Sequence, residues 1–222
     1  MNSHHKYLAA FDLDRTILPV NSSKLILTAA RKNGLMSRWQ LSQAIGYFII
    51  YKFDLLEPTR IVNAMMGWLK GMKEEDVIRI NNELIIPTLI KTIRPEMKAE
   101  IEYHKNHNAK VIILSSALPY LCNPISNHLG MDDVICSHLE VVNGRFTGKS
   151  IGSLVYKHEK QVQMAAYCEK HKFSLNTAWY YGDAFTDRFV LSAVGNPVCV
   201  KPEIKLRLRA KKRGWKVMVL KT

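Results

Sequence analysis

The sequence predicts an α/β fold, with a Rossmann-like parallel sheet as its core and an all-helical cap inserted into it. Short, strongly apolar runs suit strands that are buried on both faces, as in a parallel sheet. Helical patterns lie between most of these runs, and this alternation is typical of an open parallel α/β sheet. One block, from about residue 21 to residue 89, has helical patterning and no convincing strand. A helical insertion after the first strand is the simplest interpretation.

Five apolar runs are the predicted strands of the core, and three helices and one hairpin lie among them. The strands cover residues 7–11, 110–114, 177–181, 197–200 and 215–220. The helices cover residues 96–106, 118–129 and 159–171. Residues 139–146 carry an Asn-Gly pair between β-prone residues, which favours a β-hairpin.

Four further helices are predicted within the insertion, over residues 24–32, 37–52, 58–69 and 74–84. Gly34, Pro58 and Gly71 mark the turns between them. We therefore expect an α/β core made of residues 1–18 and 92–222, and a helical cap made of residues 19–91.

The charge and the cysteines narrow the class of protein. A formal net charge of +13 favours anionic partners, such as phosphorylated metabolites, nucleic acid or an acidic membrane surface. The four cysteines form no CxxC pair, so we expect small buried thiols in a reducing compartment. The polar start of the chain predicts no secretory signal, and the apolar stretch 44–51 is too short to span a bilayer. We expect a cytoplasmic protein, with peripheral contact to the inner face of the membrane left open.

Three of the predicted strands end in polar clusters, and ligands of open α/β sheets bind outside the carboxyl ends of strands. Asp12 and Asp14 follow the first strand, and Asp183 follows the third. Crowded carboxylates raise each other's pKa unless a cation offsets them, and a hard cation such as Mg²⁺ suits oxygen ligands. The alternative for Asp12 and Asp14 alone is an ordinary strand end and helix cap.

Ser115 and Lys160 are the candidate phosphate-binding residues. Ser115 follows the second strand, and Lys160 begins the helix that precedes the third. Taken alone, each has an ordinary interpretation: a hydroxyl that caps the following helix for Ser115, and a solvated surface cation for Lys160.

The order, spacing and strand context of these residues resemble the haloacid dehalogenase superfamily over essentially the whole chain. The match covers a DxDxT motif at residues 12–16, Ser115, Lys160, and a GDxxxD motif at residues 182–187. Residues 139–148 (LEVVNGRFTG) and the tail segments GNPVCVKP and RGWKV look like the phosphoserine-phosphatase-like branch (subfamily IB), which carries a helical C1 cap after the first motif. The helical insertion lies where that cap belongs.

The resemblance implies a Mg²⁺-dependent phosphomonoester hydrolase that works in two steps. Asp12 would attack phosphorus and form an aspartyl-phosphate. Asp14 would protonate the leaving alcohol and then activate water. Mg²⁺ would bind between Asp12, the backbone carbonyl of Asp14, Asp183 and the phosphate.

The same resemblance gives roles to the remaining motif residues. Ser115 and Lys160 would bind the phosphoryl oxygens. Asp187 would hold Lys160 or a metal-bound water, and Thr16 would shape the turn after the nucleophile.

The substrate is less well defined than the reaction. Phosphoserine phosphatases carry a glutamate seven residues after the acid/base aspartate, where this chain has Asn21. A neutral amide binds an ammonium group less well than a carboxylate does, which argues against phosphoserine. Arg60 would contact an anionic substrate from the cap, or lie as a solvated arginine on a helix surface. A small metabolite phosphate and a lipid head group both stay open as substrates.

Two segments allow more than one interpretation. The apolar helix at residues 41–56 is either buried core or a patch that meets lipid or an apolar substrate. Residues 201–216 hold eight basic residues and one acid, which form either a solvated helix face or a contact with anionic lipid or nucleic acid.

Two alternative functions remain beside hydrolysis. A phosphotransferase would pass the phosphoryl group of the same aspartyl-phosphate to an alcohol other than water. A nucleic-acid-binding module would use the basic C-terminal segment, although no known recognition signature is visible. The sequence does not define the oligomeric state.

Overall fold

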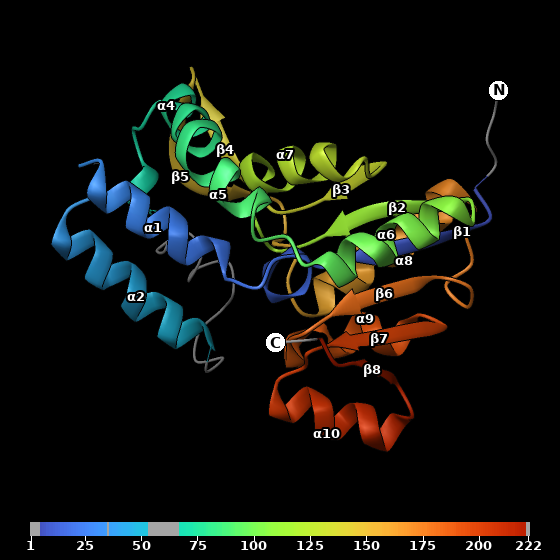
Figure 1. Cartoon of the computed structure of the whole chain (residues 1–222). Coiled ribbons are helices and arrows are strands. Elements are labelled where there is room, and N and C mark those ends of the chain that lie inside the picture. Colours follow the sequence, from blue (N-terminus) through green and yellow to red (C-terminus); the bar gives the residue numbers. More distant parts are fainter. Residues whose placement is uncertain (1–4, 35, 53–66, 221–222) are drawn as a thin grey trace.

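A six-stranded, all-parallel sheet forms the core of the computed structural model, which describes residues 5–34, 36–52 and 67–220 (Figure 1). Its strand order is β3-β2-β1-β6-β7-β8. This arrangement, with helices on both faces, confirms the predicted fold class. The strands are β1 (Tyr7–Phe11), β2 (Ala109–Leu114), β3 (Asp133–Ile135), β6 (Trp179–Gly182), β7 (Asn196–Val200) and β8 (Lys216–Met218).

The central strand β1 pairs in parallel with β2 on one side and β6 on the other. Its inner residues alternate between two apolar layers: Ala9 and Phe11 belong to one, Leu8 and Ala10 to the other. The first layer includes side chains of α6 (Pro95–Asn106) and α7 (Pro119–Leu129). The second includes side chains of α8 (His158–His171), α9 (Arg188–Ala193) and α10 (Ile204–Arg213). Burial of β1 on both faces explains its continuous apolar sequence.

Among the described residues of the insertion after β1, the regular elements are helices, and Lys73 forms an isolated β-bridge with Arg145. The insertion contains α1 (Ser22–Lys32), α2 (Arg38–Lys52), α4 (Glu74–Ile80) and α5 (Ile86–Ile90), with a tighter 3-10 turn at Gly67–Leu69 and a wider π-helical turn at Asn81–Ile85. Most of the predicted helix at 58–69 lies outside the described residues. The domain boundaries at residues 18/19 and 91/92 stay a prediction.

The hairpin of β4 (His138–Val142) and β5 (Arg145–Ile151) packs against this insertion (Figure 1). Phe146 exchanges backbone hydrogen bonds with Gly71 and Met72, at 2.8 and 3.0 Å. The buried side chains of Phe146, Leu69 and Leu139 form a small apolar cluster there. The hairpin therefore connects the far end of the insertion to the part of the chain that carries the sheet.

The structure adds elements that the apolar runs did not predict. β3 has only three residues, none of them fully buried, and α5 and α9 are too short to show a periodic pattern. All four cysteines are free and buried, as expected from the sequence. Among the described residues, no helix has the length and apolarity that a membrane crossing requires.

We expect Ile113→Ala to lower the free energy of unfolding by about 2–5 kcal/mol, because the side chain is fully buried in β2 and its loss leaves a cavity. Urea denaturation followed by circular dichroism measures this change. Ile151→Ala is the matched control, since 58% of Ile151 is exposed and its loss should cost less than about 0.5 kcal/mol. Equal losses in the two variants would contradict this description of the core.

Candidate active site

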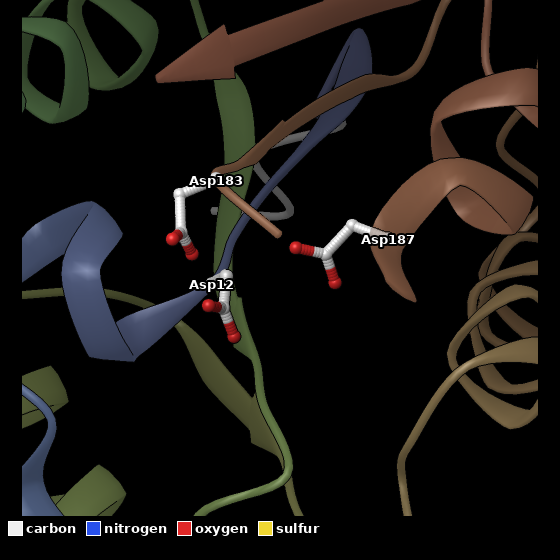
Figure 2. A group of neighbouring side chains, drawn as sticks. All are labelled: Asp12, Asp183 and Asp187. Atoms are coloured by element: carbon white, nitrogen blue, oxygen red, sulfur yellow. The ribbon is translucent and has the colours of Figure 1, made fainter. Parts of the chain in front are cut away.

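Three buried carboxylates meet at the carboxyl edge of the sheet (Figure 2). Asp12 follows β1 directly, Asp183 follows β6, and Asp187 lies in the short helical turn Phe185–Asp187. One carboxylate oxygen from each lies within 4.8 Å of the other two. Each residue is at most 6% exposed. Parallel pairing of β1 with β6 brings the first two side chains together, although 171 positions separate them in the sequence.

Lys160, from the first turn of α8, supplies positive charge to this cluster. Its Nζ donates hydrogen bonds to Asp12 Oδ1 at 2.8 Å, Asp187 Oδ1 at 2.8 Å and the hydroxyl of Tyr180 at 2.9 Å. Burial alone would lower the pKa of Lys160, but the charges of Asp12 and Asp187 outweigh burial and hold that pKa well above its usual value. The lysine is therefore a permanently charged, oriented cation and not a solvated surface residue.

Asp12 and Asp183 retain protons more strongly than ordinary aspartates, chiefly because they are buried. Burial raises the pKa of Asp12 to about 6, against the opposing effect of Lys160. Burial and the charges of Asp12 and Asp187 raise the pKa of Asp183 to about 8, against Arg15 and Lys160. Such shifts are typical of a site that accepts a further cation.

Gly182 is needed for the close approach of Asp187. A Cβ atom at this glycine would lie 2.7 Å from Asp187 Oδ2 and 2.8 Å from Tyr180 Cε1, which neither group could tolerate without moving. The backbone N–H of Ala184 also donates to Asp187 Oδ2, at 3.2 Å. The glycine and this turn together orient the carboxylate that binds Lys160.

Asp14 faces the insertion instead of the three-carboxylate cluster. It lies in the turn Leu13–Ile17, and its Oδ1 accepts a hydrogen bond of 2.9 Å from the backbone N–H of Ser22, the first residue of α1. Burial raises the pKa of Asp14, while the hydrogen bonds from Ser22 lower it. A carboxyl group with a raised pKa that is oriented by a helix N-terminus suits an acid/base role.

Arg15 adopts a left-handed backbone conformation, with φ of 60°. Its Nε lies 3.3 Å from Asp183 Oδ2, and its side chain is half exposed. It contributes a second, more solvated positive charge at the edge of the cluster.

Of the other predicted residues, Ser115 and Thr16 are buried beside the site and Asn21 lies at its border. Ser115 follows β2, next to the end of β1, and its Oγ accepts a hydrogen bond of 3.3 Å from the N–H of Ala117. The Thr16 hydroxyl is buried, with no hydrogen-bond partner among the described residues. The Asn21 side chain caps α1 by accepting from the N–H of Ser23 at 3.0 Å. Arg60 and the side chains of residues 48–56 lie outside the described part of the chain.

Comparison with known proteins identifies the family of this chain. The model of the haloacid dehalogenase-like hydrolases matches residues 9–192, which is most of the chain. The chain belongs to this family. The resemblance inferred from the motifs is thereby confirmed.

This haloacid dehalogenase-like hydrolase is similar over most of its length to a named relative and to two solved structures. It is 24% identical to a histidinol-phosphatase of Neisseria meningitidis, over 97% of this chain and 100% of the relative. A crystal structure of a protein of unknown function from Bordetella pertussis has a TM-score of 0.86 at 21% identity, covering 98% and 100% of the two chains. A phospho-aspartyl intermediate analogue of phosphoserine phosphatase has a TM-score of 0.72 at 19% identity, covering 98% and 94%. At these identities the structures share the fold.

The carboxylate cluster of this hydrolase suits a hard divalent cation. Asp183 Oδ2 is buried and has no hydrogen-bond partner among the described residues, although Arg15 lies nearby. Carboxylate oxygens are the ligands that Mg²⁺ prefers. Asp187 lies within the same group of oxygens, but one of its oxygens already binds Lys160.

Like Arg15, Tyr180 is a site residue that the sequence did not reveal. Its hydroxyl accepts a hydrogen bond from Lys160 and donates to Asp187 Oδ1 at 3.2 Å. It is fully buried in β6. A tyrosine in an apolar strand normally indicates core packing, so no sequence signal marked this one.

We expect the affinity of this hydrolase for Mg²⁺ to rise between about pH 6 and pH 8 and then level off. Mg²⁺ has to displace the protons that Asp12 and Asp183 retain, and the ionised fraction of both groups increases over this range. Isothermal titration calorimetry with MgCl₂ at several pH values measures the affinity. Asp183→Asn should weaken binding, whereas Asp76→Asn, a surface control, should not. An affinity equal for all three proteins would contradict the assignment.

Proposed function

We propose that this chain is a Mg²⁺-dependent phosphomonoester hydrolase that works through an aspartyl-phosphate on Asp12. One observation carries the proposal. Asp12 is a buried carboxylate at the end of the central strand, hydrogen-bonded to a charged lysine and surrounded by two further carboxylates. That environment suits an anionic nucleophile that must approach an anionic phosphate.

In the first step, the Oδ of Asp12 forms a bond to phosphorus while the bond from phosphorus to the ester oxygen breaks. The leaving oxygen takes the proton of Asp14, whose raised pKa supports its role as the acid. Lys160 and the Ser115 hydroxyl bind the phosphoryl oxygens and stabilise the negative charge on these oxygens in the transition state. The product alcohol then leaves.

In the second step, water attacks the phosphorus of the aspartyl-phosphate and Asp14 accepts its proton. The bond from phosphorus to Asp12 breaks, which releases phosphate and restores the carboxylate. Mg²⁺, held by Asp12, the backbone carbonyl of Asp14 and Asp183, would reduce the repulsion between carboxylate and phosphate and orient the phosphate. Without a cation, two like charges at van der Waals distance repel strongly in a buried site.

The substrate class is a small phosphate monoester, or one carried by a lipid. Relatives named histidinol-phosphatase and phosphoserine phosphatase suggest amino-alcohol phosphates as part of any substrate panel. Adding alcohols to the assay separates hydrolysis from phosphotransfer, because a phosphotransferase would produce new phosphate esters in preference to free phosphate.

We expect Mg²⁺-dependent release of phosphate from an aryl phosphate, and a loss of at least about a thousandfold in kcat for Asp12→Asn, which removes the nucleophile. A colorimetric phosphate assay measures both rates, with and without EDTA. Asp76→Asn, the same chemical change on the surface, should keep wild-type activity. Full activity of Asp12→Asn would contradict the assignment of Asp12 as the nucleophile.

We expect poor turnover of phosphoserine relative to other phosphomonoesters, because Asn21 caps α1 and has no charge to balance an ammonium group. Asn21→Glu should raise kcat/KM for phosphoserine selectively, with little change for an aryl phosphate that lacks the ammonium. Steady-state kinetics on both substrates makes the comparison. Wild-type preference for phosphoserine would contradict this interpretation of Asn21.

A further inference from the structure

The outer face of α10 combines positive charge with exposed aliphatic side chains. The ten residues Ile204–Arg213 include six basic residues and no acidic one. Leu206 and Ala210 are fully buried against the sheet and anchor the helix. By contrast, Ile204 is 79% exposed and Leu208 is 65% exposed. These two lie one helical turn apart and therefore on the same face.

The basic residues flank this aliphatic pair on both sides. At 3.6 residues per turn, Arg207 and Lys211 lie on one side of the pair, and Lys205 and Lys212 on the other. All four are exposed. An apolar centre between two rows of cations is the pattern of a helix that lies in the plane of a membrane interface.

We propose that this face of α10 docks the protein on an anionic lipid bilayer. The cations would contact lipid phosphates while Ile204 and Leu208 enter the boundary between head groups and acyl chains. A purely solvated helix gains nothing from two exposed aliphatic side chains on one face. A nucleic-acid phosphate backbone would use the cations but leave the aliphatic pair in water. Charge and apolar surface together favour lipid.

The docking face adjoins the edge of the sheet that carries the candidate active site. The backbone N–H of Glu203, just before α10, donates to the carbonyl of Asp183 at 3.1 Å, and the Glu203 carboxylate accepts from the N–H of Phe185. Val219, which follows β8 at the same edge of the sheet, is 79% exposed. Figure 1 shows α10 along the flank of the sheet formed by β7 and β8.

This position bears on the substrate as well. If α10 lies on a bilayer, the edge of the sheet with Asp12 and Asp183 is brought close to the lipid head groups. A phosphate monoester carried by a lipid then becomes the favoured substrate class, an extension that rests on the proposed function.

Vesicle flotation tests the docking directly. The purified full chain should float with vesicles of phosphatidylglycerol and phosphatidylcholine in about equal amounts, and not with phosphatidylcholine alone. The binding should weaken as salt is raised, because salt screens the exposed charges. Absence of binding to the anionic vesicles, or equal binding to both kinds, would overturn the proposal.

Two pairs of variants separate the apolar from the charged contribution. Ile204→Ser/Leu208→Ser should weaken vesicle binding about tenfold, while the control Ile151→Ser/Val162→Ser, which also removes two exposed aliphatic residues, should not. Lys205→Gln/Lys212→Gln should weaken it by a similar factor, while Lys98→Gln/Lys170→Gln should not. Tight binding of duplex DNA, equal in wild type and Ile204→Ser/Leu208→Ser and without vesicle binding, would assign the face to nucleic acid instead.

Activity measurements distinguish failure of the docking from failure of the proposed function. Ile204→Ser/Leu208→Ser should hydrolyse phosphatidic acid in anionic vesicles about tenfold more slowly than wild type, and a soluble aryl phosphate at the same rate. Hydrolysis of the aryl phosphate without vesicle binding would overturn the docking and leave the function standing. Vesicle binding without hydrolysis of any phosphomonoester would leave the docking and overturn the function.

Discussion

The hydrogen bonds from Lys160 to Asp12 and Asp187 are the interaction on which the site depends. Ions taken out of water lose solvation that only close partners can offset, and truncating one partner of a buried pair typically costs several kcal/mol. Lys160 meets that requirement with three hydrogen bonds of 2.8–2.9 Å. Asp183 has no equivalent partner among the described residues, and burial together with the charges of Asp12 and Asp187 raises the pKa of that carboxylate to about 8. The protein therefore folds around a site that still favours a cation.

The parallel sheet makes this concentration of charge possible. Parallel strands end at one edge, so β1 and β6 deliver Asp12 and Asp183 to the same place, and the first turn of α8 delivers Lys160. The insertion is coupled to the candidate active site at the first residue of α1, because the N–H of Ser22 orients Asp14. A movement of α1 would thus reorient the proposed acid without disturbing Asp12, which the central strand fixes. Because β1 positions Asp12 and α1 orients Asp14, a substrate that moves α1 can reorient Asp14 while Asp12 stays in place.

The sequence was informative where a residue's role depends on type and spacing. The apolar runs before Asp12 and Asp183 predicted the sheet, and the four motifs predicted the family. Residues that follow parallel strands lie at the same edge of the sheet, so their place in the site could be inferred from the sequence. It was uninformative where a role depends on contacts between distant side chains. Tyr180 reads as core, and only its hydroxyl's distance from Lys160 shows otherwise. The position of Asp14 depends on a turn with a left-handed Arg15, which no local pattern required. β3 is too short to have a pattern.

The overall charge and the charge of the site have opposite signs, and this opposition has a physical use. A chain with a net charge of +13 attracts phosphorylated molecules, and six of its 32 basic residues lie on α10. The cluster that the phosphate must reach is rich in carboxylates and would repel it. A cation held by Asp183 would reduce that repulsion, while Asp187 keeps Lys160 in place through their hydrogen bond. Surface cations therefore attract the phosphorylated substrate, while the residues around Asp12 carry out the reaction. Substitutions on α10 should change the rate at which the substrate binds and leave the reaction at Asp12 unchanged.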